Sequence, residues 1–311
     1  MKYLMTIWSQ SPKDYFIIDN LINFLKKKKI EVTIIYQDQK NNKDLKNKLN
    51  CITHKIFNTN INFLNKVFFI FYLFYLIFFI FIKKPNTLIL FNNYPILITK
   101  FIKLFFNGRI IYHNFDYEPQ TKDKVKKILN YFEKKNVKEF DKIIFSNEKR
   151  AVLFKKGLKE HIKIDTIYNC LPKNFFKKLK KKKGKIKKVF RIGTIGPGHG
   201  LVNLIKSFKY LPDSYRLIIC GIVVDKKFYY DLLKIIQNNS IKNKIKIFTS
   251  VSQKGWMNKM INCDLGVAFY EPINTSHKNM VGASQKINSY LAAGLPILLS
   301  NEKQFKTFTQ K

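Results

Sequence analysis

A single lysine, Lys286, lies where a short predicted helix would begin and is the clearest candidate for anion chemistry. The segment 284–297 reads SQKINSYLAAGLPI; Ile287 and Leu291 are four residues apart on one helical face, and Gly294 predicts the helix end. The first turn of a helix offers free backbone N–H groups and a positive dipole end, to which the lysine adds a full charge. The segment therefore predicts a phosphate site at Lys286, with an ordinary surface lysine as the alternative.

A glycine-rich loop is the second candidate. Residues 193–200 read GTIGPGHG and follow a predicted strand at 189–192. Four glycines in these eight residues, between a strand and a helix, allow the backbone to approach a diphosphate closely. The spacing differs from the G-x-G-x-x-G fingerprint with a downstream acid, and it does not favour a nicotinamide dinucleotide.

A polar loop in the first half is the third candidate. Residues 113–119 read HNFDYEP and follow a predicted strand. In open α/β sheets, ligands bind beyond the carboxyl ends of the strands. The loop brings together an imidazole and two carboxylates, His113, Asp116 and Glu118, which suit acid–base chemistry or acceptor binding. The alternative is a loop that only caps the next helix.

These three segments need elements to position them, and the hydrophobic pattern predicts an α/β fold. A strand at 3–8, a helix from Asp14 and a strand at 31–36 form a β-α-β unit, which predicts a parallel, doubly wound sheet. Further strands are predicted at 87–91, 109–113, 141–145 and 162–167, and helices at 95–106, 121–135 and 148–154. A second series has strands at 189–192, 216–220, 245–249, 264–269 and 295–299, and helices from Leu201, at 255–261 and at 284–293.

A lysine-rich stretch separates the two series. Residues 177–188 are mostly lysine, a composition typical of a solvated segment. We therefore expect an N-terminal domain at 1–176, a linker at 177–188 and a C-terminal domain at 189–311. A length of 311 residues allows two domains with a core each.

The charge of the chain indicates an anionic partner without identifying it. There are 58 Lys and Arg residues against 20 Asp and Glu residues, a formal net charge of +38, which suits nucleic acid or an anionic membrane surface. An alternative is AT-rich coding, which also favours Lys, Asn, Ile and Phe. Arginine, the better residue for bidentate phosphate and base contacts, occurs only at 109, 150, 191 and 216. No nucleic-acid-binding motif occurs, so nucleic acid is not the expected partner.

The segment 67–82 is an unbroken apolar run, rich in phenylalanine and flanked by lysines. A membrane-spanning helix usually needs about 20 apolar residues, and lysines at both ends give no orientation. Three interpretations stay open: a helix that packs on the fold and dips into an anionic membrane interface, a transmembrane segment, and a wholly buried core helix. Apolar surface beside many lysines favours the first.

The cysteines and the N-terminus indicate a cytoplasmic protein. Cys51, Cys170, Cys220 and Cys263 are far apart and form no C-x-x-C pair, as expected of reduced thiols. The apolar run at the N-terminus is too short for a secretory signal.

In their order along the chain, several segments resemble GT-B glycosyltransferases, specifically the family-4-type retaining group. They are RIGTIGPGHGLVNLIKSF, YRLIICG, CDLGVAFYEP and SQKINSYLAAGLPIL, the last resembling the family pattern P-N-K-x-x-E-Y-x-x-x-G-x-P. The first half matches more loosely, through its β-α-β opening, the loop at 113–119 and the YNCLP segment. The resemblance covers nearly the whole chain and implies two Rossmann-like domains facing a cleft.

The resemblance also implies roles. A nucleotide-sugar would bind mainly to the C-terminal domain and the acceptor mainly to the N-terminal domain. No metal and no cofactor would be needed, because helix N-termini and cationic side chains neutralise the leaving diphosphate. The implied donor-binding residues are Gly196, Gly198, His199, Glu271, Lys286 and Ser289, and the residues implied to face the acceptor or the transferred sugar are His113, Asp116 and Glu118.

Three features depart from the family pattern. His199 stands where Arg or Lys is common, although an imidazole can still donate a hydrogen bond to phosphate. Ser289 stands where the family has a glutamate for the ribose, and its hydroxyl cannot replace a carboxylate acceptor. The sequence stops at Lys311, which predicts a truncated second domain with an uncovered sheet edge.

The sequence therefore predicts a glycosyltransferase that is peripheral on the cytoplasmic face of the cell membrane. It would transfer a sugar from a nucleotide-sugar to a surface-polysaccharide or lipid-linked glycan acceptor. One alternative is a catalytically inactive or fragmentary GT-B relative that acts as a membrane-associated binding subunit. A more distant alternative is a membrane protein built around the segment 67–82.

Overall fold

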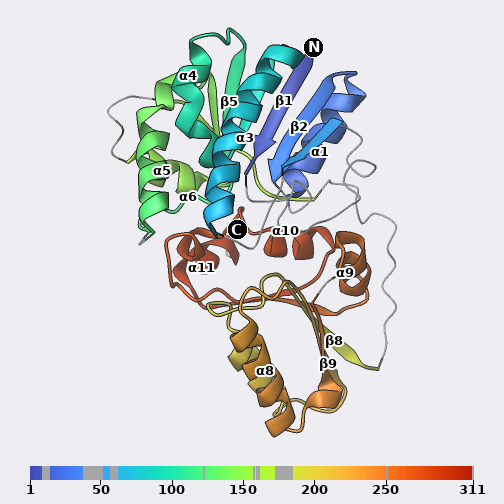
Figure 1. The fold of residues 1–311 in the computed structure, drawn as a ribbon. Coiled ribbons are helices and arrows are strands. Elements are labelled where there is room, and N and C mark those ends of the chain that lie inside the picture. The colour runs from blue at the N-terminus through green and yellow to red at the C-terminus, as the bar shows by residue number, and fades with distance from the viewer. Residues whose placement is uncertain are drawn as a thin grey trace. The chain divides into compact units, whose positions relative to one another are not determined.

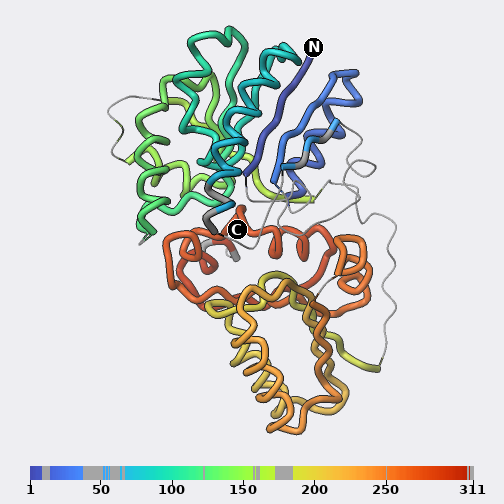
Figure 2. The backbone as a smooth tube through the Cα atoms, in the orientation of Figure 1, coloured from blue at the N-terminus to red at the C-terminus, as the bar shows by residue number. Residues whose placement is uncertain are grey.

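The computed structural model describes residues 1–8, 15–37, 52–56, 62–121, 123–156, 158, 162–171, 185–249 and 251–309. These residues form two compact units, Met1–Asn169 and Cys170–Lys311 (Figures 1 and 2). Each unit has its own parallel sheet and its own hydrophobic core.

The N-terminal unit is built on a parallel sheet whose described strands lie in the order β3-β2-β1-β4-β5-β6-β7. The strands are β1 (Lys2–Ile7), β2 (Glu31–Gln37), β3 (Ile52–Ile56), β4 (Thr87–Phe91), β5 (Arg109–Asn114), β6 (Lys142–Phe145) and β7 (Ile164–Thr166). Met5 of β1 lies opposite Ile34 of β2 on one side and Ile89 of β4 on the other. The chain order therefore reverses between β1 and β4, as in doubly wound sheets.

Helices cover both faces of this sheet, because successive strand residues point to opposite sides and both sides are apolar. The helices are α1 (Phe16–Lys27), α3 (Asn62–Lys83), the 3₁₀ turn η2 (Tyr94–Ile98), α4 (Thr99–Lys103), α5 (Lys124–Lys135), the 3₁₀ turn η3 (Val137–Glu139) and α6 (Glu148–Lys155). Leu4 packs in the cluster that contains Leu76 of α3, and its neighbour Met5 packs in the cluster that contains Ile22 of α1.

Helix α3 has one buried face and one exposed face, although both are apolar. The buried residues Tyr72, Leu76 and Ile80 follow a four-residue spacing. The exposed residues are Ile70, Phe71, Phe74, Phe78, Phe81 and Ile82, each 55–66% exposed. The alternative of a wholly buried helix at 67–82 is therefore wrong. Among the helices that the structure describes, none combines the length and the apolar content needed for a membrane crossing.

The C-terminal unit is built on a second parallel sheet, with described strands in the order β10-β9-β8-β11-β12. The strands are β8 (Lys187–Ile192), β9 (Tyr215–Cys220), β10 (Ile245–Phe248), β11 (Leu265–Ala268) and β12 (Ile297–Leu299). The helices are α7 (Leu201–Ser207), α8 (Lys226–Asn238), η4 (Lys242–Lys244), α9 (Gln253–Met260), η5 (His277–Asn279), α10 (Gln285–Ala292) and α11 (Lys303–Thr309). The chain order reverses between β8 and β11, so the crevice expected in such sheets lies at their carboxyl ends.

Tyr290 fixes helix α10 against the centre of this sheet. Its side chain is fully buried, and its hydroxyl accepts a hydrogen bond from the backbone N–H of Ile192 at 3.0 Å. The ring lies over Gly266 of β11 so closely that an added Cβ would be 2.6 Å away. Any larger residue at Gly266 would push α10 off the sheet, so this glycine helps to set the position of the helix that carries Lys286.

The predicted fold class is confirmed, and most predicted strands lie within a few residues of their expected positions. The continuous helix predicted at 95–106 is wrong: Pro95 lies in the 3₁₀ turn η2, and the α-helical part is only Thr99–Lys103. Strand β3 and helices α8 and α11 were not predicted. Of the predicted linker, 177–184 lies outside the described residues, whereas Lys187 and Lys188 belong to β8, because they pair with β9.

Candidate functional site

A buried arginine extends from β8 into the start of the glycine-rich loop. Arg191 is 1% exposed; its Nη1 donates to the carbonyl of Gly193 at 2.8 Å and its Nη2 to the carbonyl of Thr194 at 2.5 Å. Burial lowers the pKa of the guanidinium to about 10. Because β8 lies inside the sheet, its backbone is fixed, and this arginine holds the first two loop residues in place.

The second buried cation is Lys286, in the first turn of α10. Its side chain is 8% exposed and its Nζ lies 4.5 Å from the centre of the Tyr270 ring. Its Cε lies 3.4 Å from the place where a Cβ of Gly193 would be. Burial lowers the pKa of the amine well below its usual range, and the charge of Arg191 lowers this pKa further.

Lys286 has no counter-ion within the described residues, which distinguishes it from another buried lysine of the same unit. Lys244 is 9% exposed, but its Nζ lies 2.9 Å from a carboxylate oxygen of Asp213 and donates to the carbonyl of Leu211 at 2.7 Å. An unpaired buried charge is costly, by several kcal/mol. Arg191 and Lys286 are neighbouring buried basic side chains that no described carboxylate pairs with, and the arrangement suits a bound anion.

The start of helix α10 is held by side-chain hydrogen bonds. The hydroxyl of Ser284 accepts from the backbone N–H of Ile287 at 3.1 Å and lies 2.7 Å from the hydroxyl of Tyr270. Ser284 therefore caps the helix, as Ser commonly does, and links the cap to the segment that follows β11. The predicted helix is confirmed, and Lys286 lies in its first turn as expected.

His199 lies beside the two cations and is neutral. Burial lowers its pKa to about 3, and the charges of Lys286 and Arg191 act in the same direction. Its ring centre lies 5.0 Å from that of His277, and its Nδ1 has no hydrogen-bond partner in the described part of the chain. A neutral imidazole here can donate or accept a hydrogen bond without adding charge.

Of the predicted residues Gly196, Gly198 and Glu271, the last two are joined by hydrogen bonds between the glycine-rich loop and the segment after β11. The Glu271 carboxylate accepts from the backbone N–H of Gly200 at 3.1 Å, and the Glu271 N–H donates to the carbonyl of Gly198 at 3.1 Å. An added Cβ would lie 2.8 Å from a neighbouring side chain at Gly196 and 2.5 Å from one at Gly198. The glycines are therefore needed for packing within the unit, and their contact with a donor stays a prediction.

The hydroxyl of Ser289 is used inside its own helix. Ser289 is fully buried, and its Oγ donates to the carbonyl of Gln285 at 2.6 Å, one turn earlier in α10. Its predicted role at the nucleotide stays a prediction.

Two residues of the cationic site, Arg191 and Gly193, were not among the predicted site residues. The sequence contains a signal for the first: Arg191 is one of few arginines and interrupts an apolar strand immediately before the glycine-rich loop. A cation at a buried strand position has to find an anion or carbonyl oxygens, so it marks a site more clearly than an exposed lysine does.

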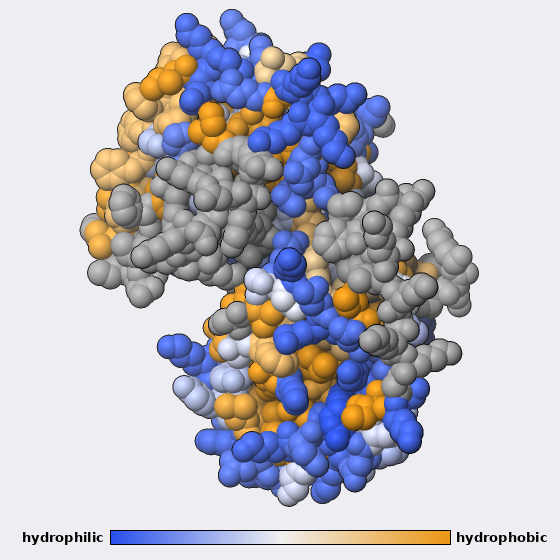
Figure 3. Space-filling view, turned by 90° about the vertical axis from the view of Figure 1, so that its right-hand side faces the viewer, coloured by the Kyte–Doolittle hydropathy of each residue, from blue (hydrophilic) through white to orange (hydrophobic). Residues whose placement is uncertain are grey.

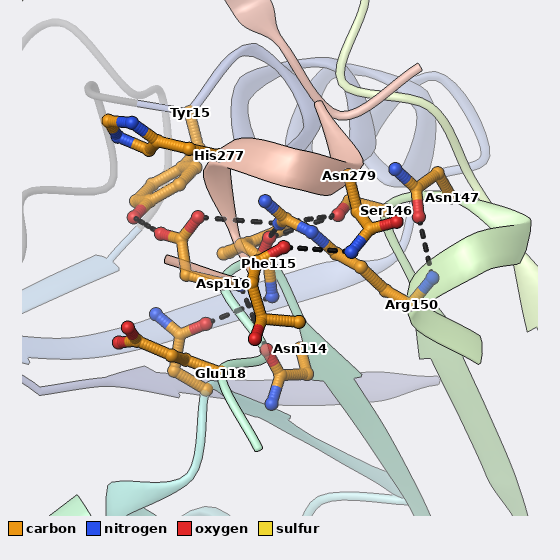
Figure 4. Close-up of polar contacts among 12 residues, drawn as sticks. Tyr15, Asn114, Phe115, Asp116, Glu118, Ser146, Asn147, Arg150, His277 and Asn279 are labelled. Carbon is orange, nitrogen blue, oxygen red and sulfur yellow. Dashed lines mark hydrogen bonds and ion pairs between the residues drawn. The ribbon is translucent and has the colours of Figure 1, made fainter. Parts of the chain in front are cut away.

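In the N-terminal unit, the loop after β5 presents Asp116 on a rigid support (Figure 4). The carbonyl of Phe115 accepts hydrogen bonds from Nη1 of the buried Arg150 and from the hydroxyl of Ser146, the latter at 2.9 Å. The same Nη1 lies 3.4 Å from one carboxylate oxygen of Asp116, and the hydroxyl of Tyr15 donates to the other at 3.4 Å. The side chain of Asp116 is 60% exposed, so a fixed carboxylate faces solvent.

The three predicted groups of this loop have different surroundings, and no hydrogen bond joins them within the described residues. His113 lies in β5 rather than in the loop, is 3% exposed and packs against the ring of Phe115, with ring centres 4.5 Å apart. Burial lowers the pKa of His113 to about 3, so it is neutral at pH 7. The Glu118 carboxylate pairs with Lys126 at 3.0 Å. Of the two predicted carboxylates, Asp116 is thus the one that Arg150 and Tyr15 hold in position and that is also largely exposed.

A buried carboxylate lies behind the same loop. Glu133 of α5 is fully buried; its Oε1 accepts from the hydroxyl of Tyr112 at 2.5 Å and from the side-chain amide of Asn114 at 2.7 Å. Its Oε2 has no partner in the part of the chain that the structure describes. Burial raises the pKa of Glu133 to about 7, although both hydrogen bonds act to lower it.

Comparison with solved structures identifies the fold of the chain. No family model matches the chain, and no curated protein does. Among solved structures, HepE from Anabaena in complex with UDP and glucose is 13% identical, with a TM-score of 0.70, and the match covers 99% of this chain and 82% of that one. Sucrose-phosphate synthase from Thermosynechococcus elongatus is 10% identical, with a TM-score of 0.70 and coverage of 98% and 82%. A glycosyltransferase from Rickettsia africae is 13% identical, with a TM-score of 0.66 and coverage of 97% and 79%. The chain therefore has the GT-B fold.

Proposed function

We propose that the chain is a glycosyltransferase that binds a nucleotide-sugar in its C-terminal unit, with the diphosphate at Arg191 and Lys286. The observation that carries the proposal is this pair of buried cations without a described counter-ion, at the carboxyl end of β8 where the strand order reverses. A GT-B fold supports it, because HepE, which shares this fold, was solved with UDP-glucose.

The proposed chemistry is stabilisation of a leaving diphosphate. When a sugar is transferred, negative charge grows on the phosphate oxygen that it leaves. Cations fixed in a buried site stabilise that charge strongly, because no solvent has to reorganise around it. Arg191 is fixed by two carbonyl oxygens, and Lys286 lies between Gly193 and the ring of Tyr270. His199 is placed to donate a hydrogen bond to the same phosphates.

The loop after β5 is the proposed binding site for the acceptor or the transferred sugar. Asp116 is the best placed of its three predicted groups, because Arg150 and Tyr15 hold its carboxylate while most of its surface is exposed. We assign to it a hydrogen bond with a hydroxyl of the acceptor or of the transferred sugar. His113 is assigned to the support of the loop, through its contact with Phe115.

The proposed acceptor is a surface-polysaccharide or lipid-linked glycan at the cytoplasmic membrane face, with the protein bound peripherally. The apolar face of α3 continues onto the next helical segment, because Phe81 stacks on Phe105 with ring centres 4.6 Å apart, and Phe101 packs on the same ring. Figure 3 shows hydrophobic residues gathered at one edge of this unit. Lys84 and Lys100 are exposed beside this surface and suit anionic lipid headgroups.

A screen of nucleotide-sugars tests the proposed reaction. The purified chain is incubated with uridine, guanosine, adenosine and thymidine diphosphate sugars, and release of the free nucleoside diphosphate is measured. We expect release from one class of donor and a loss of about 100-fold or more in Lys286→Ala, because one charge on the leaving group is no longer neutralised. Lys244→Ala removes a buried lysine that has its own counter-ion and is the matched control. Binding without release would favour the alternative of an inactive binding subunit.

A further inference from the structure

Arg191 does more in this site than add a charge. We propose that it is a positioning residue that holds the glycine-rich loop and keeps the neighbouring Lys286 amine without its extra proton until a diphosphate binds, so that donor binding takes up a proton. This inference rests on the proposed function, because the diphosphate is the ligand that completes the site.

Arg191 fixes the start of the glycine-rich loop. The guanidinium donates to two consecutive carbonyls, of Gly193 and Thr194, from two separate nitrogens held in one plane, a fixed geometry that a single ammonium nitrogen lacks. The Gly193 N–H donates to the carbonyl of Cys220 in β9 at 3.0 Å. Gly193 has a φ of +120°, which other residues rarely adopt. The loop therefore starts in one fixed conformation, with Gly193 against Lys286.

The groups that face the Lys286 amine come from several elements. They are the guanidinium of Arg191 from β8, the imidazole of His199 from the glycine-rich loop and the ring of Tyr270 after β11. Beyond them, Tyr290 of α10 acts on Arg191, and His277 of η5 lies beside His199. None of these groups is an anion at neutral pH. The carboxylate of Glu271 is exposed and bonded to the N–H of Gly200.

A bound diphosphate makes the protonated form of the Lys286 amine the more stable one. Without it, a proton on Lys286 would put a second positive charge beside Arg191 in a buried site, where like charges repel strongly. With it, the negative oxygens stabilise both cations. The amine nitrogen then accepts a proton from solvent and becomes an ammonium, and the buffer supplies that proton; no other bond changes. The burial-lowered pKa of Lys286 agrees with this sequence of events.

Calorimetry in different buffers measures the proton directly. UDP is titrated into the protein at pH 8, where its terminal phosphate, with a second pKa near 6, is already ionised. The titration is repeated in Tris and HEPES buffers, whose ionisation enthalpies differ. The slope of observed enthalpy against ionisation enthalpy is the number of protons taken up. We expect a slope of roughly one half to one proton for the wild type and a slope near zero for Lys286→Met.

Two variants of Arg191 separate its charge from its hydrogen bonds. Arg191→Lys keeps the charge but loses the fork, so we expect weaker UDP binding, by about ten-fold, with the proton uptake retained. Arg191→Gln removes the charge, so the pKa of Lys286 rises and the slope falls below that of the wild type, although burial still acts to lower the pKa. Circular dichroism of each variant confirms that it is folded; a merely structural role for Arg191 would lower affinity in both variants and leave the slope unchanged.

The outcomes distinguish this inference from the function on which it rests. UDP binding without proton uptake in the wild type overturns the inference and leaves the proposed function standing. The same holds for an unchanged slope in Arg191→Gln. Uptake that persists in Lys286→Met but disappears in His199→Gln assigns the proton to the histidine and also overturns it. Absence of binding by UDP and by the other nucleoside diphosphates overturns the proposed function and the inference together.

Discussion

The side chain of Lys286 lies against Gly193, where an added Cβ would meet the Lys286 Cε at 3.4 Å and the Nζ at 3.9 Å. The two residues come from different elements, helix α10 and the loop after β8, and are far apart in sequence. Their contact depends on Tyr290, which fixes α10 to β8, and on Arg191, which fixes the loop. The cationic site is therefore assembled by the sheet and does not belong to one local motif.

This contact predicts that Gly193→Ala weakens nucleotide binding. The alanine has to adopt a φ near +120°, and its methyl group would lie in van der Waals contact with the Lys286 side chain, in the space beside the amine where a phosphate would bind. We expect a loss of about 1–3 kcal/mol in the free energy of unfolding, from backbone strain, and a loss of about ten-fold in UDP affinity. Urea denaturation measures the first and calorimetry the second.

Gly294→Ala is the matched control for that prediction. Gly294 also has a positive φ, +62°, but a Cβ there would meet nothing within 4 Å. This variant should lose stability, by about 1 kcal/mol, and bind UDP as the wild type does. Equal loss of affinity in both variants would show that the effect is general strain and not displacement of Lys286.

The buried Glu133 predicts a stability that falls as pH rises. Its pKa is raised from 4.5 to about 7 in the folded protein, so the folded state holds a proton that the unfolded state releases. The resulting stabilisation is fully present below pH 4.5 and is lost as pH rises through 7. In Glu133→Gln the amide stays neutral and can still accept from Tyr112 and Asn114.

The prediction for Glu133→Gln therefore concerns how the free energy of unfolding, relative to the wild type, changes between two pH values. Relative to the wild type, the variant should gain about 2.5 kcal/mol in the free energy of unfolding between pH 5 and pH 8. Urea denaturation at both values measures it. A constant difference between the two proteins would contradict a raised pKa at Glu133.

The exposed face of α3 predicts binding to anionic vesicles. Phe74 and Phe78 are 66% and 55% exposed on that face. Replacing both by serine should weaken binding to phosphatidylglycerol-containing vesicles by ten-fold or more, because a buried aromatic side chain contributes about 1.5–3 kcal/mol. Binding should also weaken with added salt, since lysines contribute. Co-sedimentation with vesicles measures both.

Phe24→Ser supplies the control for the vesicle experiment. Phe24 is 56% exposed on α1, whose buried residues pack on the opposite face of the sheet from those of α3. Its loss should leave vesicle binding unchanged. Equal weakening by the α1 and α3 variants would show that general hydrophobicity, and not the α3 face, is responsible.

Much of the fold could be predicted because its signals are local. The strands of both sheets are short apolar runs bounded by turn residues, and α10 has a serine cap and a glycine end within one segment, so Lys286 could be placed in a first helical turn. Strand β3 was missed because Ile52–Ile56 is apolar only at its two ends, with three polar residues between them. The structure of 95–106 was misjudged because apolar periodicity does not distinguish a 3₁₀ turn from an α-helix.

The site was harder to predict because tertiary packing of separate elements decides which of its side chains are buried and which contact one another. His113 was expected at the end of a strand, with its imidazole available to the loop, yet β5 extends to Asn114 and the imidazole is in the core. Ser289 occupies a motif position, but its hydroxyl is bonded within α10. Arg191 has a local signal, an arginine within an apolar strand, but its burial and its lack of a described counter-ion depend on β9, β11 and α10, which are separate in sequence.

The most direct test of the central claim is the affinity of the chain for UDP, measured by calorimetry in the wild type, Lys286→Ala and Lys244→Ala. If Arg191 and Lys286 form the diphosphate site, the wild type and Lys244→Ala bind with similar affinity and Lys286→Ala binds at least about ten-fold more weakly, a loss of about 1.4 kcal/mol. Equal affinity in all three proteins would contradict the account.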